Sequence, residues 1–399
     1  MIRENCILKV PHLRFPEFEG EWEKCKLGDI ATGFDYGMNA PAKVFDGVNK
    51  YIRITDIDEA SSTYNDSDIV SPDGTLTDTY LVNERDILLA RTGASTGKSY
   101  LYKKTDGKLY FAGFLIRANV PEHNPYFVFS QLHTHRYWKW VSIMSARSGQ
   151  PGINSQEYSS FPIYTTSIQE ERKISKLLSL LEERIATQSK LIEDLKKLKS
   201  AIIDYAINSH DTDFVKFGSL YEMAGEGGTP TTSNASFYDN GKIPFIKIDD
   251  LKKKYLTKNK DFITELGLQK SSAWLVPTRS ILFSNGATIG EITITTYPVC
   301  TKQGILGIVP KPNIDVEFLY YFMSSSYFKK AVSRIVTEGT MKTVYLKDIN
   351  NIRCPIPTKE KQLDIAKMPS ALNSKIDFEQ SILKLFGSQK QYLLRQMFM

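Results

Sequence analysis

The chain has 399 residues, of which 41% are hydrophobic and 24% are charged, and its formal net charge is +6. This composition is ordinary for a globular chain of two or three domains with buried cores. The mild positive charge is compatible with an acidic partner such as DNA, but solubility alone accounts for as much.

Cysteine and histidine usage argues against a disulfide framework and against a structural zinc site. The four cysteines lie far apart without a C-x-x-C pair, which suits reduced thiols. His133 and His135 are the only close histidine pair, and no cysteine lies near them in the sequence. The N-terminus lacks an apolar signal core and no apolar run approaches membrane-spanning length, so we expect a cytoplasmic chain without membrane contact.

The chain contains an internal repeat. Residues 51–57 (YIRITDI) correspond to residues 245–251 (FIKIDDL) at an offset of 194 residues (245 − 51). Three further pairs follow in the same order with a drift of only a few residues: 81–88 with 275–282, 93–97 with 286–290, and 161–163 with 354–356. The shared order and nearly constant offset indicate a duplicated unit, in which a mixed domain is followed by a long helix.

The first part of each copy predicts strands and short helices. Short runs rich in Val, Ile, Tyr and Thr, bounded by Gly, Pro, Asn and Asp, predict strands at residues 86–90, 291–295 and 304–309. Asn124 followed by Pro125 is typical of a helix N-cap and the first helical residue, and Asp315 is the matching start in the second copy. We therefore predict the α+β class, with mixed domains at residues 1–165 and 210–357.

Two long helices are predicted at residues 166–209 and 358–399. Apolar residues recur in a rhythm typical of a coiled-coil seam, at Ile174, Leu178, Leu181, Ile185, Ile192, Leu195 and Ile202 in the first helix, and at Ile365, Leu372, Ile376, Ile382, Phe386 and Leu393, with Met368 and Gln389 between them, in the second. Gln188 and Lys199 take two polar positions of the first seam. Pro369 is expected to kink the second helix or delay its start, and Gly387 to weaken its middle.

The two helices are expected to pair with one another, because a single helix of this length would expose its seam. An antiparallel pair is favoured by the chain order of domain, helix, domain and helix. The two domains would then be related by a pseudo-twofold axis at opposite ends of a rod of about 60 Å, at ~1.5 Å per residue.

Two motifs resemble catalytic signatures, and neither fits. Residues 91–99 (RTGASTGKS) end in Gly-Lys-Ser, but they are one residue too short for a phosphate-binding loop, and Glu291 replaces the lysine in the second copy. Residues 124–127 (NPYF) differ from the N-P-P-Y motif of amino-methyltransferases, and no glycine-rich methyl-donor loop precedes them. We therefore predict no catalytic centre.

Polar loop residues, many of them at matching places in the two copies, are the candidates for DNA contact. Residues 91–98 form either a tight Gly-rich turn or a surface that presents donors to guanine edges and phosphates. The basic residues among 252–260 are either a solvated face or a phosphate contact. The candidates are Arg53, Thr55, Asp56, Arg91, Gly93, Ser95, Thr96, Lys98, Ser148 and Gln150 in the first copy, and Lys247, Asp249, Lys252, Asn285, Thr288, Thr340 and Lys342 in the second.

The order of domain, long helix, domain and long helix resembles the specificity subunit of bacterial type I restriction-modification enzymes. The likeness spans nearly the whole chain. It rests on residues 10–22 (VPHLRFPEFEGEW), 227–231 (GGTPT), 240–251 (NGKIPFIKIDDL), and 161–163 (FPI) leading to 169–174 (QEERKI). The second copy departs from the family pattern at residues 361–365 (KQLDI) and at Pro369.

This resemblance implies a non-catalytic subunit whose two target-recognition domains each read one half of an asymmetric, bipartite double-stranded DNA target. The helices would fix the gap between the half-sites and dock two adenine-methyltransferase subunits, which motor-nuclease subunits join. S-adenosylmethionine, ATP and Mg²⁺ would act in those partners, with no cofactor or metal on this chain, in the bacterial cytoplasm. The alternative hypothesis is a coiled-coil scaffold whose two domains bind protein rather than DNA.

Overall fold

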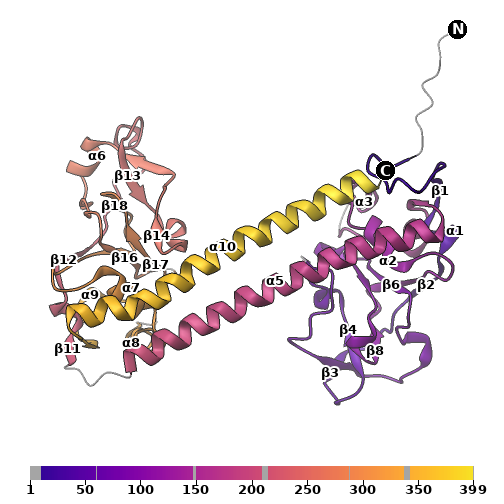
Figure 1. Cartoon of the computed structure of the whole chain (residues 1–399), viewed down its shortest axis with the longest axis horizontal. Coiled ribbons are helices and arrows are strands. Elements are labelled where there is room, and N and C mark those ends of the chain that lie inside the picture. The colour runs from indigo at the N-terminus through magenta and orange to yellow at the C-terminus, as the bar shows by residue number, and fades with distance from the viewer. Residues whose placement is uncertain are drawn as a thin grey trace, which may run out of the picture. The chain divides into compact units, whose positions relative to one another are not determined.

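The computed structural model describes residues 10–59, 61–146, 150–208, 214–286, 288–336 and 342–398. The chain divides into two compact units: unit 1 comprises Met1–Gln188 and Ile382–Met399, and unit 2 comprises Ser189–Ser381. Each unit contains one strand-rich globule and a part of both long helices (Figure 1). The predicted α+β class is confirmed.

The globule of unit 1 is built on a four-stranded antiparallel sheet with the strand order β2-β9-β6-β7. Its central strand β6 (Asp86–Ala90) is buried at every residue, as its apolar sequence predicts. The other strands are β2 (Thr32–Tyr36), β7 (Ser99–Leu101) and β9 (Leu115–Asn119). The globule also contains three two-stranded sheets: β1 (Glu23–Lys26) with β10 (Pro162–Thr165), β3 (Ala42–Val44) with β5 (Val70–Pro72), and the parallel pair β4 (Lys50–Ile52) and β8 (Leu109–Phe111).

The globule of unit 2 repeats the main sheet of unit 1 and the pairings β1–β10 and β4–β8. Its main sheet has the order β12-β19-β16-β17-β14, so that β12 (Tyr221–Glu226), β19 (Ile305–Pro310), β16 (Ile281–Ser284) and β17 (Ile292–Thr295) take the places of the four strands of unit 1, and β14 (Tyr255–Leu256) extends the sheet. The smaller sheets pair β11 (Phe214–Lys216) with β20 (Arg353–Pro355), and β13 (Ile243–Ile246) with β15 (Asp261–Ile263) and, in parallel, with β18 (Cys300–Thr301). The register is shared as well. Leu88 of β6 faces Arg117 of β9, and its counterpart Leu282 of β16, at the offset of 194, faces Gly307 of β19. The predicted duplication is therefore confirmed.

Three short helices occur in the same order in both units: α2 (Pro125–Gln131), α3 (His135–Met144) and α4 (Ser155–Ser159) in unit 1, and α7 (Val316–Ser324), α8 (Ser326–Ile335) and α9 (Leu346–Ile349) in unit 2. Two others have no such match: α1 (Leu27–Ile30) lies between β1 and β2, and α6 (Glu265–Gln269) lies between β15 and β16. Asn124 Oδ1 accepts hydrogen bonds from the backbone N–H groups of Tyr126 and Phe127. Asp315 Oδ1 caps α7 in the same way. Both predicted helix starts are confirmed.

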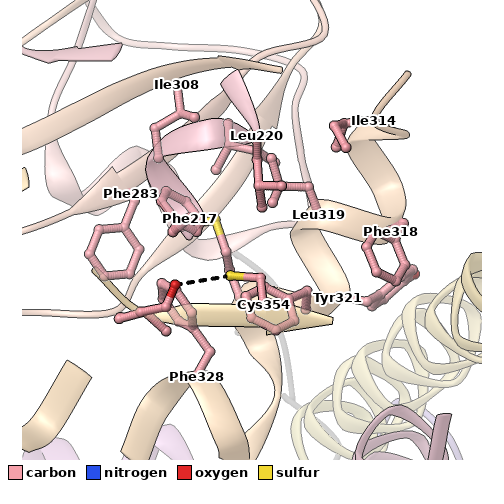
Figure 2. Close-up of a cluster of buried hydrophobic side chains, with 14 of the residues drawn as sticks. Phe217, Leu220, Phe283, Ile308, Ile314, Phe318, Leu319, Tyr321, Phe328 and Cys354 are labelled. Atoms are coloured by element: carbon pink, nitrogen blue, oxygen red, sulfur yellow. Dashed lines mark hydrogen bonds between the residues drawn. The ribbon is translucent and has the colours of Figure 1, made fainter. Parts of the chain in front are cut away.

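Aromatic rings fill the core of unit 2 between the sheet and α7, α8 (Figure 2). The ring of Phe328 lies 5.6 Å from that of Phe217 and 6.1 Å from that of Phe283, measured between centroids. Cys354 is completely buried beside them, and burial raises the pKa of its thiol. The three cysteines among the described residues, Cys25, Cys300 and Cys354, are all free thiols.

The long helices α5 (Ile168–Asn208) and α10 (Lys359–Met397) pack against each other inside each unit. In unit 1, Lys390 Nζ lies 2.6 Å from Glu182 Oε1, and the guanidinium of Arg184 lies 5.3 Å from the centre of the Phe386 ring. Residue numbers therefore rise along α5 while they fall along α10, as in an antiparallel pair. In unit 2, Lys199 Nζ donates to Asn373 Oδ1 at 3.0 Å, so a polar seam position contacts the partner helix.

At each end of the seam, the helix residues pack into the hydrophobic core of a globule. Ile174, Leu178 and Leu181 join Leu393 in a cluster that also contains Trp22 and Phe127 of the globule. Of the other predicted seam residues, Ile192 and Ile376 are buried, and Ile185, Leu195, Ile202, Ile365, Leu372 and Ile382 are partly buried. Near its C-terminus α5 instead buries Ile203 and Ile207 in the core of unit 2.

Two expected seam residues of α10 are wrong. Met368 is 58% exposed and Gln389 is also exposed, so neither belongs to the seam. In the first turns of α10 the buried positions are Gln362, Ala366 and Pro369, one residue away from the predicted register, because this part of the helix packs on the globule. Of the two effects expected of Pro369, a delayed start is excluded, since α10 begins ten residues earlier at Lys359, while a kink stays a prediction.

The first turn of each long helix is hydrogen-bonded to the N-terminus of a short helix of its own globule, α2 in unit 1 and α7 in unit 2. We call this contact the helix–globule junction. In unit 1, the buried Glu171 accepts a hydrogen bond from the backbone N–H of Asn124 at 2.8 Å and contacts His123 Nδ1 at 2.8 Å. In unit 2, Gln362 Oε1 accepts from the backbone N–H of Asp315 at 2.8 Å. The junction satisfies buried backbone donors at equivalent places in both units.

We expect Glu171→Ala to lower the free energy of unfolding by about 1–3 kcal/mol, because the N–H of Asn124 then lacks its acceptor. Chemical denaturation followed by circular dichroism measures the loss. Glu183→Ala, an exposed site on the same helix, is the matched control and should change the value by less than about 0.5 kcal/mol. An equal loss in both variants would contradict the role of the junction.

The junction of unit 1 should also depend on pH. The hydrogen bond to Glu171 raises the pKa of His123 above its usual value of 6.5. A raised folded-state pKa gives stability that is fully present below pH 6.5 and is lost as the pH rises through the folded-state pKa. The difference in melting temperature between the wild type and His123→Gln should therefore be larger at about pH 6 than at about pH 9; a difference that does not change with pH would exclude this linkage.

Candidate nucleic-acid interface

The Gly-rich segment after β6 is a packed turn that leads into another strand. Gly93 and Gly97 have φ angles of +67° and +92°, and a Cβ at Gly97 would lie 2.8 Å from Val141 Cγ1. Thr96 Oγ1 donates to the carbonyl oxygen of Gly93 at 2.8 Å, and Ser95 is partly buried. Because β7 begins at Ser99, the serine of the Gly-Lys-Ser sequence, where a phosphate-binding loop would open a helix, this segment is not a phosphate-binding loop.

Two basic candidates of unit 1 are engaged by carboxylates of the same globule. Arg53 Nε lies 2.8 Å from Asp56 Oδ2, and Arg53 Nη2 lies 3.2 Å from Asp68 Oδ2. These contacts, led by the hydrogen bonds to Asp56, raise the pKa of Arg53. Lys98 Nζ lies 3.2 Å from Glu59, whose side chain is 84% exposed. Thr55, which lies between Arg53 and Asp56 in the sequence, is exposed.

Arg91 has different surroundings. Its backbone N–H donates to the carbonyl oxygen of Phe114 at 3.0 Å, and its own carbonyl accepts from Ile153 N at 2.9 Å. Its guanidinium carbon lies 4.8 Å from the centre of the Tyr36 ring. Arg91, Tyr36 and Phe114 line a cavity of about 330 Å³ together with Tyr51 and residues 37–40 and 112–113. Gln150 is exposed close by, with Nε2 3.3 Å from where a Cβ of Gly93 would lie.

Tyr36 and Phe114 were missed by the sequence reasoning. They are 40% and 56% exposed, which is unusual for aromatic side chains that flank a central sheet. The signal that could have found them is the comparison of the two copies, because Glu226 and Gly304 take their places in unit 2: Tyr36 pairs with Ile116 as Glu226 pairs with Leu306, and Gly304 accepts the N–H of Asn285 as Phe114 accepts that of Arg91.

The basic stretch of unit 2 divides into an outer and an inner part. Lys252 is exposed and lies 3.3 Å from Asp249, and Lys247 Nζ donates to Asp261 Oδ1 at 2.8 Å. Lys254 points inward: its side chain is 3% exposed and its Nζ lies 2.6 Å from Glu317 Oε2 and 2.9 Å from Ser370 Oγ. Lys254 therefore ties the globule to α10 and is not free to contact phosphate.

The remaining candidates of unit 2 are placed differently from one another. Asn285 is 2% exposed, and its Nδ2 donates to the carbonyl oxygen of Val344 at 3.2 Å, so its amide faces the globule itself. Its Oδ1 is buried without a hydrogen-bond partner in the part of the chain that the structure describes. Thr288 and Lys342 are exposed. Ser148 and Thr340 lie outside the described residues.

Among the described residues, no group of three or more His, Cys, Asp or Glu side chains could hold a metal ion. Within the same residues, no helix combines the length and the apolarity that crossing a membrane requires. The buried ionisable groups, such as Glu171 and Lys254, have partners inside their own unit.

Comparison with known proteins yields one family and several relatives. The family profile described as "Type I restriction modification DNA specificity domain" matches residues 19–197 and again residues 210–385. The type I restriction enzyme MjaVIII specificity subunit of Methanocaldococcus jannaschii is 23% identical over 408 residues, covering 94% of this chain and 91% of that one. The MjaIX specificity subunit of the same organism is 29% identical over 170 residues, so the chain spans 39% of the length of that relative.

Among solved structures, the type I restriction-modification S subunit from M. genitalium is similar in fold. The TM-score is 0.60 at 15% sequence identity, and the match covers 98% of this chain and 99% of that one.

We expect Lys254→Ala to lower the free energy of unfolding by about 3 kcal/mol, because it leaves the half-buried Glu317 without its cation. Denaturation of the purified chain measures this change. Lys252→Ala removes the same charge from a side chain that is 71% exposed and should leave the free energy within about 0.5 kcal/mol. A small effect at Lys254 would show that the inner lysine does not hold the globule to α10.

Proposed function

The chain belongs to the type I restriction-modification DNA specificity family, and we propose that it reads an asymmetric, bipartite double-stranded DNA target for a restriction-modification complex. Each unit takes one half of the target. The chain itself performs no chemistry: it directs two adenine-methyltransferase subunits and the motor-nuclease subunits that join them. S-adenosylmethionine, ATP and Mg²⁺ act in those partners, in the bacterial cytoplasm, and this chain binds no cofactor.

The observation that carries the proposal is that one scaffold is used twice with different surface chemistry. The two units share strand order and register. At equivalent places, unit 1 carries Tyr36 and Arg91, whereas unit 2 carries Glu226 and Asn285. Two copies of one scaffold suit two half-sites on one DNA molecule, and different side chains at equivalent places suit half-sites of different sequence.

The helix–globule junction supports the second part of the proposal. A protein that reads two half-sites at a fixed spacing needs each reading surface to be held rigidly to the element that sets the spacing. Glu171 and Gln362 make such a link between each globule and its long helix. In the proposal, α5 and α10 set the gap between the half-sites and provide the surface on which the methyltransferase subunits dock.

Methylome sequencing of a host with and without this gene tests the proposal. Deletion should abolish adenine methylation at one bipartite motif, and the wild-type gene should restore it. A chain in which residues 20–165 come from another member of the family should change one half of the motif and keep the other. Unchanged methylation after deletion would exclude the proposal and favour a scaffold that binds protein; a change in both halves would exclude one unit per half-site.

A further inference from the structure

Arg91 is the basic candidate in unit 1 whose charge is left unmatched. Arg53 and Lys98 have carboxylate partners, and Arg117, which lies on the neighbouring strand, has its own in Asp35 at 2.8 Å. Arg91 has no ion-pair partner among the described residues, and its Nε is buried without a hydrogen-bond partner there. A partly buried charge without an anionic partner is costly to maintain, which indicates that its acceptor comes from outside the chain.

The surroundings of Arg91 favour a flat acceptor over a phosphate. Its guanidinium lies 4.8 Å from the Tyr36 ring, whose hydroxyl donates to Ser155 Oγ and accepts from Ser155 N. The exposed ring of Phe114 forms another wall of the same cavity. An aromatic ring stacked on a guanidinium keeps its planar fork in one orientation, which suits the two acceptors on the edge of a base, whereas a phosphate is strongly hydrated and is usually met by protruding side chains. The cavity, at about 330 Å³, has room for the edge of a base.

The other unit supports the same conclusion. Asn285 has the backbone bonds of Arg91: its N–H donates to Gly304 and its carbonyl accepts from Val344 N. Its side chain, however, bonds to its own globule, and Glu226 Oε1 accepts from Gly304 N at 2.9 Å in the place of the Tyr36 ring. Phosphate contacts carry no sequence information and would be of use in both units alike. A cation present in only one unit is better explained by sequence readout.

We propose that Arg91 reads a guanine in the half-site bound by unit 1, through paired hydrogen bonds from its guanidinium to O6 and N7. Tyr36 holds the guanidinium flat for this contact, and Phe114 closes the other side. Unit 2 has no such reader at the equivalent place and uses other residues for its half-site. The proposal rests on the function proposed above and adds to it one base and the side chain that selects it.

The test uses the complex of the full chain with its methyltransferase partner and DNA duplexes that carry the target. Each guanine of the unit 1 half-site is replaced in turn by 7-deazaguanine, which lacks the N7 acceptor. One of these replacements should weaken binding by the wild type roughly tenfold or more, and the same replacement should leave the affinity of Arg91→Ala unchanged. Arg91→Lys keeps the charge but loses the planar fork, so it should keep the salt dependence of binding and lose the guanine preference.

Lys24→Ala is the matched control, because Lys24 is an exposed cation of the same globule; it should keep the full 7-deazaguanine effect. Co-purification with the partner subunit and a melting temperature no lower than that of the wild type confirm that each variant is folded. If Arg91→Ala weakens all sequences equally and lowers the salt slope by about one, Arg91 contacts phosphate and the inference is wrong, while the proposed function stands. A wild-type half-site without a guanine would also overturn it. A wild-type complex without any sequence preference would instead overturn the proposed function.

Discussion

The helix–globule junction is the contact on which the rest of the architecture depends. A long helix has a defined direction but no means of its own to orient a globule at its end. A buried acceptor in the first turn of each helix supplies that means, since it satisfies a backbone N–H at the start of a short helix of the globule. Glu171 does this with a carboxylate and Gln362 with an amide, so the geometry is shared although the charge is not. Any surface loop of the globule is then positioned relative to the helix that carries it.

Within the globules, the availability of a polar side chain depends on its partners more than on its place in the sequence. Asp56 engages Arg53, Glu59 engages Lys98, Asp261 engages Lys247 and Asp249 engages Lys252. These pairs remove most of the basic candidates from the set of free cations, although the formal net charge remains positive. The mildly basic composition is therefore a weak guide to the interface, because an ion pair within the protein leaves little field outside it. What distinguishes Arg91 is its unmatched charge together with two exposed aromatic neighbours.

The sequence predicted the class, the duplication, the short-helix starts and the existence of both long helices, because these depend on local patterns and on repetition. The prediction failed where tertiary packing decides which of several neighbouring residues is buried. Met368 lies outside the seam although it is apolar, since the first turns of α10 bury Ala366 and Pro369 against the globule. Likewise, nothing in a run of three lysines indicates that Lys254 points inward. Tyr36 and Phe114 were not predicted as site residues, because what marks them is their position beside Arg91, which is distant in sequence and adjacent in space.

Duplication also explains how two different readers can evolve on one framework without loss of the fold. The backbone bonds that hold residues 91 and 285 run from main chain to main chain, so they do not depend on which side chain occupies the place. Arg91 can face a cavity while Asn285 faces its own globule, and the strand, the turn and the junction remain the same. The framework thus separates the residues that support the globule from those that can vary, and the asymmetry of a target would arise entirely from the second group.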